Sequence, residues 1–237
     1  MRVLWFMEML HSFAPDLWLA DGPTVNAAAG FAYPTRMAVI KLSAGGLVLL
    51  SPVAPGEALC AAVGRLGPVH HLIAPNKLHN LFIGQWKAAF PAAIMHAAPG
   101  LRDRRPDLAF DADITDTPHP DWAGQIDQTV LHNRIADEAV FFHRESGTAL
   151  FTDLLQGLPP GWFSGWRSIV ARLDGMTGPE PRVPRKFRLA FTDRKALRQA
   201  MATVLGWPVK NVVMAHGTPI TSDARAYLAR AFAWSRP

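Results

Sequence analysis

The chain has 237 residues, of which 49% are hydrophobic and 18% are charged, and its formal net charge is +5. This composition supports a sizeable buried core and argues against wholesale disorder, while no apolar run reaches the roughly 20 residues that cross a bilayer. The single cysteine, Cys60, excludes an internal disulfide and a multi-cysteine zinc site, and it fits a reducing, cytoplasmic compartment.

The first half of the chain predicts strands that alternate with helices. Residues 1–8 lack the small-residue cleavage site of a signal peptide. Residues 17–23 predict a short strand and turn, and residues 37–42 and 47–50 predict a β-hairpin with Gly45 and Gly46 in its turn. The following pattern predicts a helix over 55–66, a strand over 69–74, a helix over 81–90 and a strand over 93–97.

The second half predicts three strands, then helices around one further strand. Residues 99–121 are rich in Pro, Asp and Arg and predict a surface excursion. Strands are expected over 128–132, 138–142, 148–152 and 209–214, a loop over 156–166, and helices over 168–174, 193–205 and 222–234, the last with Ser222 as N-cap. Because no repeat or long linker interrupts the chain, we expect one domain over residues 1–237 with an α+β fold.

A basic segment lies in the last third of the chain, where seven Lys and Arg residues fall between positions 182 and 198. It is either a solvated face of a loop and helix or a region that steers an anionic small-molecule substrate. No nucleic-acid-binding motif accompanies it, so we do not expect a nucleic-acid partner. The sequence also has no phosphate-binding glycine loop and no serine nucleophile elbow, so no nucleotide cofactor is expected.

Several polar residues follow apolar, strand-like runs. Asp153 ends the run at 148–152, His216 follows the run at 209–214, and His79 lies in the loop after 69–74. A carboxylate or imidazole at the end of a buried strand is unfavourable unless something pairs with it. We therefore interpret these positions as candidate metal ligands, although Asp153 is equally suited to cap a helix and His216 to end a strand. Adjacent His70 and His71 are interpreted as structural, and His11, His96 and His119 have no supporting context.

Five short segments, taken in order, resemble a known family: Pro34-Thr35-Arg36-Met37, Ala74-Pro75-Asn76 with His79, Val140-Phe141-Phe142-His143-Arg144, Thr152-Asp153-Leu154, and Ala215-His216-Gly217. Their order and spacing resemble the metallo-β-lactamase superfamily and, more narrowly, the uncharacterised DUF4336 group. The resemblance covers nearly the whole chain, and the order of the segments carries it rather than any single motif. It implies an αββα sandwich, with two mixed β-sheets packed face to face and helices outside.

The superfamily binds one or two Zn, Fe or Mn ions between the sheets, but its H-x-H-x-D-H loop is degraded here. The equivalent segment, residues 74–80, retains one strong ligand, His79. The resemblance implies a mononuclear site for Zn or Fe/Mn with the ligand set His79, His132, Asp153 and His216. Asn76, Asn80 and His143 are then expected beside the ligands, Asn76 and Asn80 as weak oxygen donors and His143 as a residue that orients a carboxylate.

Three functions remain open at this point. The first is a divergent metal-dependent hydrolase of an ester, amide or phosphoester that uses a metal-bound water. The second is a non-catalytic binding or scaffold protein that has the fold and has lost its metal. The third is a redox or oxygen-handling relative with iron at the same site. The hydrolase predicts an apolar-walled cleft where His79, Asp153 and His216 converge, whereas the scaffold predicts a cleft filled by Trp162 or Trp166.

Overall fold

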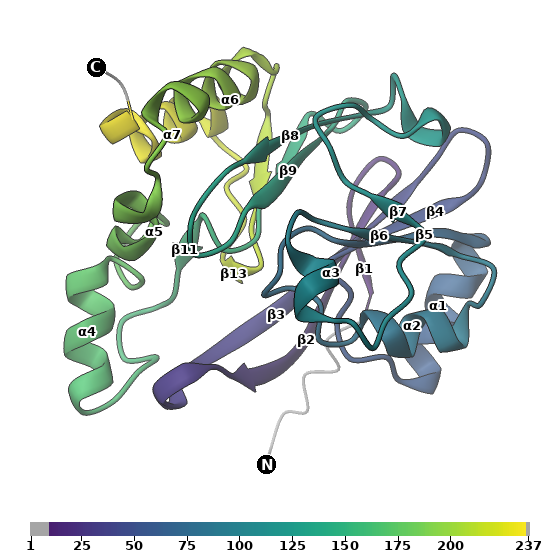
Figure 1. Ribbon diagram of the computed structural model, residues 1–237, viewed down its shortest axis with the longest axis horizontal. Helices are drawn as coiled ribbons and strands as arrows, with labels where there is room; N and C mark the ends of the chain where they lie inside the picture. The colour runs from purple at the N-terminus through teal and green to yellow at the C-terminus, as the bar shows by residue number, and fades with distance from the viewer. Residues whose placement is uncertain (1–9, 236–237) are drawn as a thin grey trace.

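The computed structural model describes residues 10–235 (Figure 1), so the expectation about residues 1–8 lies outside the described part. Two β-sheets stack face to face with helices on both outer sides, which is the expected αββα sandwich. In Figure 1, α1 and α2 lie beyond one sheet and α6 and α7 lie beyond the other. Among residues 10–235, no helix is long and apolar enough to span a membrane.

The first sheet has seven strands in sequence order: β1 (His11–Ala14), β2 (Leu17–Asn26), β3 (Ala32–Lys41), β4 (Leu47–Leu50), β5 (Val69–Ala74), β6 (Ile94–Ala97) and β7 (Ala112–Asp113). The strands from β1 to β4 are antiparallel, and those from β4 to β7 are parallel. The predicted hairpin is therefore confirmed as β3 and β4, although only Gly45 of its two glycines has a positive φ, 92°. Strand β2 runs well past the predicted turn because it pairs with β3 along most of its length.

The parallel strands need crossovers, and helices provide them. Helix α1 (Glu57–Leu66) joins β4 to β5, α2 (Ile83–Ala89) joins β5 to β6, and α3 (Leu101–Arg104) follows β6. The prediction of a surface excursion over 99–121 is wrong in part, because Leu101, Phe110 and Ile114 are buried there. Trp122 belongs to a short 3-10 turn, η2 (Pro120–Trp122), and an earlier one, η1 (Ala28–Gly30), joins β2 to β3.

The second sheet has the order β12-β10-β9-β8, with β8 (Ile126–Leu131), β9 (Glu138–His143), β10 (Thr148–Leu150) and β12 (Asn211–Val213). A separate short pair, β11 (Gln156–Gly157) and β13 (His216–Gly217), lies beside it. The helices of this half are α4 (Trp166–Asp174), α5 (Arg185–Ala190), α6 (Arg194–Gly206) and α7 (Ala224–Ala231), with the turn η3 (Ala233–Ser235) at the end. The predicted cap of the last helix is wrong: Asp223, not Ser222, precedes it, and Asp223 makes no side-chain capping bond.

The core consists of three apolar layers, as a sandwich of this kind requires. One lies between the first sheet and helices α1–α3, one between the two sheets, and one between the second sheet and helices α5–α7. A strand that is covered on both faces has no side that faces solvent. Strand β9 is an example, because all six of its residues are buried. This rigid frame places the ends of β5, β10 and β12 at one edge of the sandwich, where the candidate ligands lie.

Candidate metal centre

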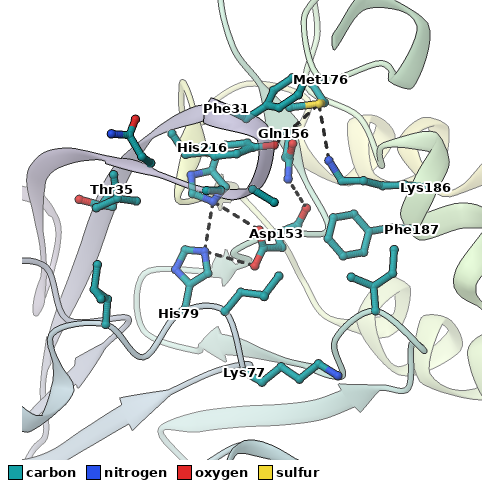
Figure 2. Close-up of a pocket in the computed structure, with 18 of the residues that line it drawn as sticks. Phe31, Thr35, Lys77, His79, Asp153, Gln156, Met176, Lys186, Phe187 and His216 are labelled. Carbon is teal, nitrogen blue, oxygen red and sulfur yellow. Dashed lines mark hydrogen bonds and ion pairs between the residues drawn. The ribbon is translucent and has the colours of Figure 1, made fainter. Parts of the chain in front are cut away.

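Three side chains converge at this edge (Figure 2): His79 and Asp153 lie in the loops that follow β5 and β10, and His216 is the first residue of β13. The Nε2 atoms of His79 and His216 are 3.1 Å apart. Asp153 completes the group, with Oδ2 3.3 Å from His79 Nε2 and Oδ1 3.4 Å from His216 Nε2. The side chains of all three are largely buried. The structure therefore brings together three of the four residues expected to be ligands.

The spacing of these four atoms, two imidazole nitrogens and two oxygens of one carboxylate, suits a small divalent cation. A tetrahedral Zn²⁺ with bonds of about 2.0–2.1 Å holds neighbouring ligand atoms roughly 3.3 Å apart. The three observed separations, 3.1, 3.3 and 3.4 Å, lie close to that value. Two imidazole nitrogens and one carboxylate suit Zn²⁺ and also Fe²⁺. The residues present therefore fit one metal ion.

Each of the three side chains is also held by a hydrogen bond to a neighbouring residue, as metal-binding residues usually are. His216 donates from Nδ1 to the Pro34 carbonyl at 2.7 Å, which directs Nε2 toward the centre. His79 Nδ1 lies 2.8 Å from Ser51 Oγ, and Asn76 donates to Asp153 Oδ2 at 2.8 Å. Ser51 has a left-handed backbone with φ of 55°, an uncommon conformation for a non-glycine residue that often occurs at functional sites.

Burial and charge act in opposite directions on these groups. Burial lowers the pKa of His79, but the adjacent Asp153 carboxylate outweighs it, and the pKa ends above its ordinary value. Burial raises the pKa of Asp153, yet the two imidazoles bring it well below the usual range. Without metal, the cluster is thus stabilised as an ion pair. A metal ion that binds here competes with a proton for the Nε2 atom of His79.

Glu138, at the start of β9, holds the loop that carries Asp153. Its carboxylate accepts backbone N–H bonds from Thr152, Asp153 and Leu154 at 2.8, 2.8 and 3.1 Å, and a bond from Asn76 Nδ2 at 3.3 Å. The side chain is fully buried. Burial, followed by the nearby Asp153 charge, raises the pKa of Glu138. Sequence reasoning missed this residue, although a charged side chain at the start of an otherwise apolar strand was a usable signal.

Arg36, on β3, holds the turn that carries His216. It donates from Nη1 to the carbonyls of Met214 and Gly217 at 2.9 and 2.6 Å, and from Nε to Asp21 at 2.7 Å. These bonds tie β3 to the segment between β12 and β13. Arg36 lies in one of the segments that carry the family resemblance, but nothing in its sequence context indicates this contact.

We expect Arg36→Ala to weaken metal binding by about tenfold or more, because His216 loses the fixed backbone that orients it. The measurement is competition with a chromophoric zinc chelator. Arg144→Ala is the matched control, since Arg144 forms a two-bond pair with Asp127 at an exposed position on the second sheet. Equal zinc affinity in the Arg36 and Arg144 variants would contradict the positioning role.

Three other expectations need correction. His132 does not join the cluster: its side chain is 56% exposed and pairs with Asp137 at 3.3 Å. His143 is buried within β9 and contacts Ser146 Oγ at 2.8 Å instead of a carboxylate of the site. Asn80 bonds the Lys77 carbonyl and accepts from Arg105, so it does not touch the ligands. Asn76 alone of the expected neighbours contacts a ligand.

The cluster lies at the base of a cleft of about 1260 Å³. Apolar side chains from η1, β3, α4 and α5 form much of its wall, among them Phe31, Tyr33, Leu173 and Leu189. Trp162 and Trp166 do not line this cleft; Trp162 bonds the Ala32 carbonyl and Trp166 packs on Phe31. Figure 2 shows His79, Asp153 and His216 turned toward one another, with Lys77, Lys186 and Phe187 around them.

The sandwich and the position of its histidine and aspartate cluster define a metallo-β-lactamase fold. The chain resembles the metallo-β-lactamase from Pontibacter korlensis, with 14% identity and a TM-score of 0.60. The match covers 94% of this chain and 98% of the other. It matches the enzyme from Erythrobacter litoralis with 14% identity, TM-score 0.62 and 95% coverage of both chains. It also matches the Flv1 flavodiiron core from Synechocystis sp. PCC6803 at 11% identity and TM-score 0.63, where 95% of this chain spans 60% of that one.

A sequence comparison assigns the chain to a family within this fold. The sequence model of DUF4336, a domain of unknown function, matches residues 25–163, more than half of the chain. The protein belongs to the DUF4336 family. Among curated proteins, none matches this sequence.

Proposed function

We propose that this protein is a metal-dependent hydrolase with one metal ion held by His79, Asp153 and His216. The observation that carries the proposal is the convergence of three buried side chains at an open cleft, where the two imidazole nitrogens are 3.1 Å apart and each lies 3.3 or 3.4 Å from one oxygen of the carboxylate. A mostly apolar pocket with a few convergent polar groups is the usual setting of a binding or active site. The family and the fold are consistent with this function and do not specify a substrate.

A bound Zn²⁺ lowers the pKa of a coordinated water to about 7 and polarises a carbonyl or phosphoryl oxygen. The chain's own residues supply the orientation. Ser51, Pro34 and Asn76 hold the three ligand side chains in their directions. Tyr33 lines the same cleft, with its ring 5.1 Å from that of His216. Burial, with the Asp153 and Asp174 charges, raises the pKa of Tyr33, so its hydroxyl stays protonated and can donate to an oxygen that gains negative charge.

The cleft suits an ester or phosphoester that has both an apolar and an anionic part. Its wall is mostly apolar, and five basic side chains lie along it: Lys77, Arg104, Arg105, Arg185 and Lys186. Within residues 10–235, Lys77, Arg104 and Arg185 form no ion pair, so their charge remains available to a ligand. Part of the basic segment at 182–198 thus faces the cleft, which favours a steering role over a merely solvated face.

The two alternative functions, a scaffold without metal and an iron-dependent relative, are less well supported, and each can be tested. A scaffold without metal gives no reason for three oriented ligands beneath an unfilled cleft. An iron-dependent relative is favoured by one observation, because two histidines and one carboxylate are also the ligand set of mononuclear Fe²⁺ enzymes. The identity of the bound metal separates the hydrolase from the iron protein.

The test combines metal content with hydrolysis. In protein purified without chelator, elemental mass spectrometry is expected to find about one equivalent of Zn, Fe or Mn per chain that is lost in His216→Ala, in line with one three-ligand site at this cluster. Nitrophenyl esters and phosphoesters are then compared, with an ester that carries a carboxylate expected to react faster than a neutral ester of equal length. A chelator should abolish hydrolysis and added Zn²⁺ should restore it. His216→Ala should be inactive, whereas His132→Ala, at the exposed position, should match the wild type.

Two outcomes would contradict the proposal. Absence of stoichiometric metal after reconstitution would support the scaffold hypothesis instead. Iron content with no hydrolysis by the zinc-loaded protein would favour the oxygen-handling alternative.

A further inference from the structure

A second cluster of imidazoles and a carboxylate lies near the other end of β5. His71 is the third residue of that strand, whereas His79 follows its end. With about 3.3 Å of rise per residue, His71 lies about 10 Å from the end of the strand. Its side chain shares the inter-sheet face with Ile73 and packs on Trp122, with ring centres 5.0 Å apart. This cluster is therefore spatially separate from the candidate hydrolase site.

The cluster is assembled from β5, β6 and the segment around η2. His71, His119 and Asp121 each present one ligand atom, and these three atoms lie within 4.8 Å of one another. His71 Nε2 is 3.1 Å from Asp121 Oδ2. On its other side, His71 Nδ1 is 3.0 Å from Nε2 of His96, which is buried on β6. Sequence reasoning left these residues without a role, because the four positions are brought together only by strand pairing and the return of the chain at η2.

The Nε2 atom of His71 is the informative feature. It is buried and has no hydrogen-bond partner, even though a carboxylate oxygen lies 3.1 Å away, so the two atoms are close but not aligned for a hydrogen bond. A buried polar atom without a hydrogen-bond partner is energetically unfavourable. A cation between the nitrogen and the carboxylate removes that penalty, because it binds both atoms at once.

The surroundings orient the His71 ring and leave the cluster open to solvent on one side. A metal-binding histidine is commonly oriented by a residue that hydrogen-bonds its second ring nitrogen, and His96 is in that position relative to His71 Nδ1. Asp121 is 52% exposed and His119 partly so, which leaves an open side for water and for entry of the ion.

We propose that His71, His119 and Asp121 form a second divalent-cation site of the Zn²⁺ class, with His96 as the positioning residue. The ring of His119 now accepts a long bond of 3.3 Å from the Asp121 backbone N–H, which a metal at that nitrogen would replace. Three N/O ligands with open positions suit Zn²⁺, and Co²⁺ is a spectroscopic substitute with the same preferences. The site does not depend on the proposed hydrolase function.

The experiment titrates Co²⁺ and Zn²⁺ into chelator-treated full-length protein and follows Co²⁺ absorption and binding heat. It uses the Asp153→Ala background, in which the candidate hydrolase site has lost a ligand. One equivalent is expected to bind in this background and to be lost in Asp153→Ala/Asp121→Asn. The matched control is Asp153→Ala/Asp103→Asn, because Asp103 is an exposed aspartate of α3 outside the cluster. His96→Gln is expected to weaken the remaining site by about 10- to 100-fold.

The outcomes are separable. If Asp121→Asn and Asp103→Asn bind metal equally in the Asp153→Ala background, the second site is wrong. If the wild type binds one equivalent that Asp121→Asn removes and Asp153→Ala does not, the second site stands and the proposed hydrolase site fails. Because Asp121 is half exposed, the Asn variant is expected to fold, and near-ultraviolet circular dichroism checks that it does.

Discussion

Replacing Asp153 with alanine is expected to reduce metal affinity at the His79–His216 pair by more than about 100-fold. Loss of a residue that only supports a ligand lowers metal affinity by about 10- to 100-fold, and Asp153 is itself one of three ligands. It also provides the charge beside both imidazoles, with oxygen–nitrogen distances of 3.3 and 3.4 Å. Two neutral nitrogens remain in the variant, and they cannot compensate the charge of a divalent ion in a buried site.

The measurement is zinc affinity by chelator competition, with ester hydrolysis measured in parallel. His132→Ala is the control, because this histidine was expected in the ligand set and lies exposed beside Asp137. Its affinity should equal that of the wild type. Asp121→Asn is measured as well, so that metal bound at the second cluster can be subtracted. Unchanged affinity in Asp153→Ala after this correction would refute the assignment.

Replacing Glu138 with alanine is expected to lower the free energy of unfolding by about 3–5 kcal/mol, the range for removing one member of a buried polar or charged network. Three backbone N–H groups, those of Thr152, Asp153 and Leu154, lose their acceptor in the interior. Each buried donor left without a partner destabilises the fold by about 1–3 kcal/mol, and entering water relieves part of this loss. Metal affinity should fall as well, because the loop that carries Asp153 is no longer held.

Urea unfolding followed by circular dichroism measures the first effect. Glu145→Ala is the matched control, since Glu145 is an exposed glutamate in the turn between β9 and β10. Its unfolding free energy should stay within about 0.5 kcal/mol of the wild type, as is usual for surface substitutions. The anchoring role is wrong if Glu138→Ala is no less stable than Glu145→Ala.

The local pattern of the sequence predicted most of the sandwich. Alternating and continuous apolar runs located the hairpin of β3 and β4 and strands β5, β6, β8 and β9, because these strands are buried on one or both faces. Short elements were missed. Helix α5 and the pair β11–β13 have too few residues to show a period, and their stability comes from what they pack against.

At the candidate site, the order of the segments predicted His79, Asp153 and His216, but not how they are held. Arg36 and His216 are 180 residues apart in numbering, and the bonds from Arg36 to the neighbouring carbonyls exist only because β3 lies against β13. His132 shows the opposite error: its position in the segment order fits a ligand, yet the backbone directs it to solvent.

The sequence by itself determined the residue types that can bind a metal, the strands that carry them and the apolar character of the core, since these depend on local chemistry and spacing. Only the tertiary structure decided which polar groups meet. His71, His96, His119 and Asp121 come from separate segments, and the register of β5 and β6, together with the return of the chain at η2, brings their side chains together. The register follows from the burial of whole sheet faces, a property that no single segment contains.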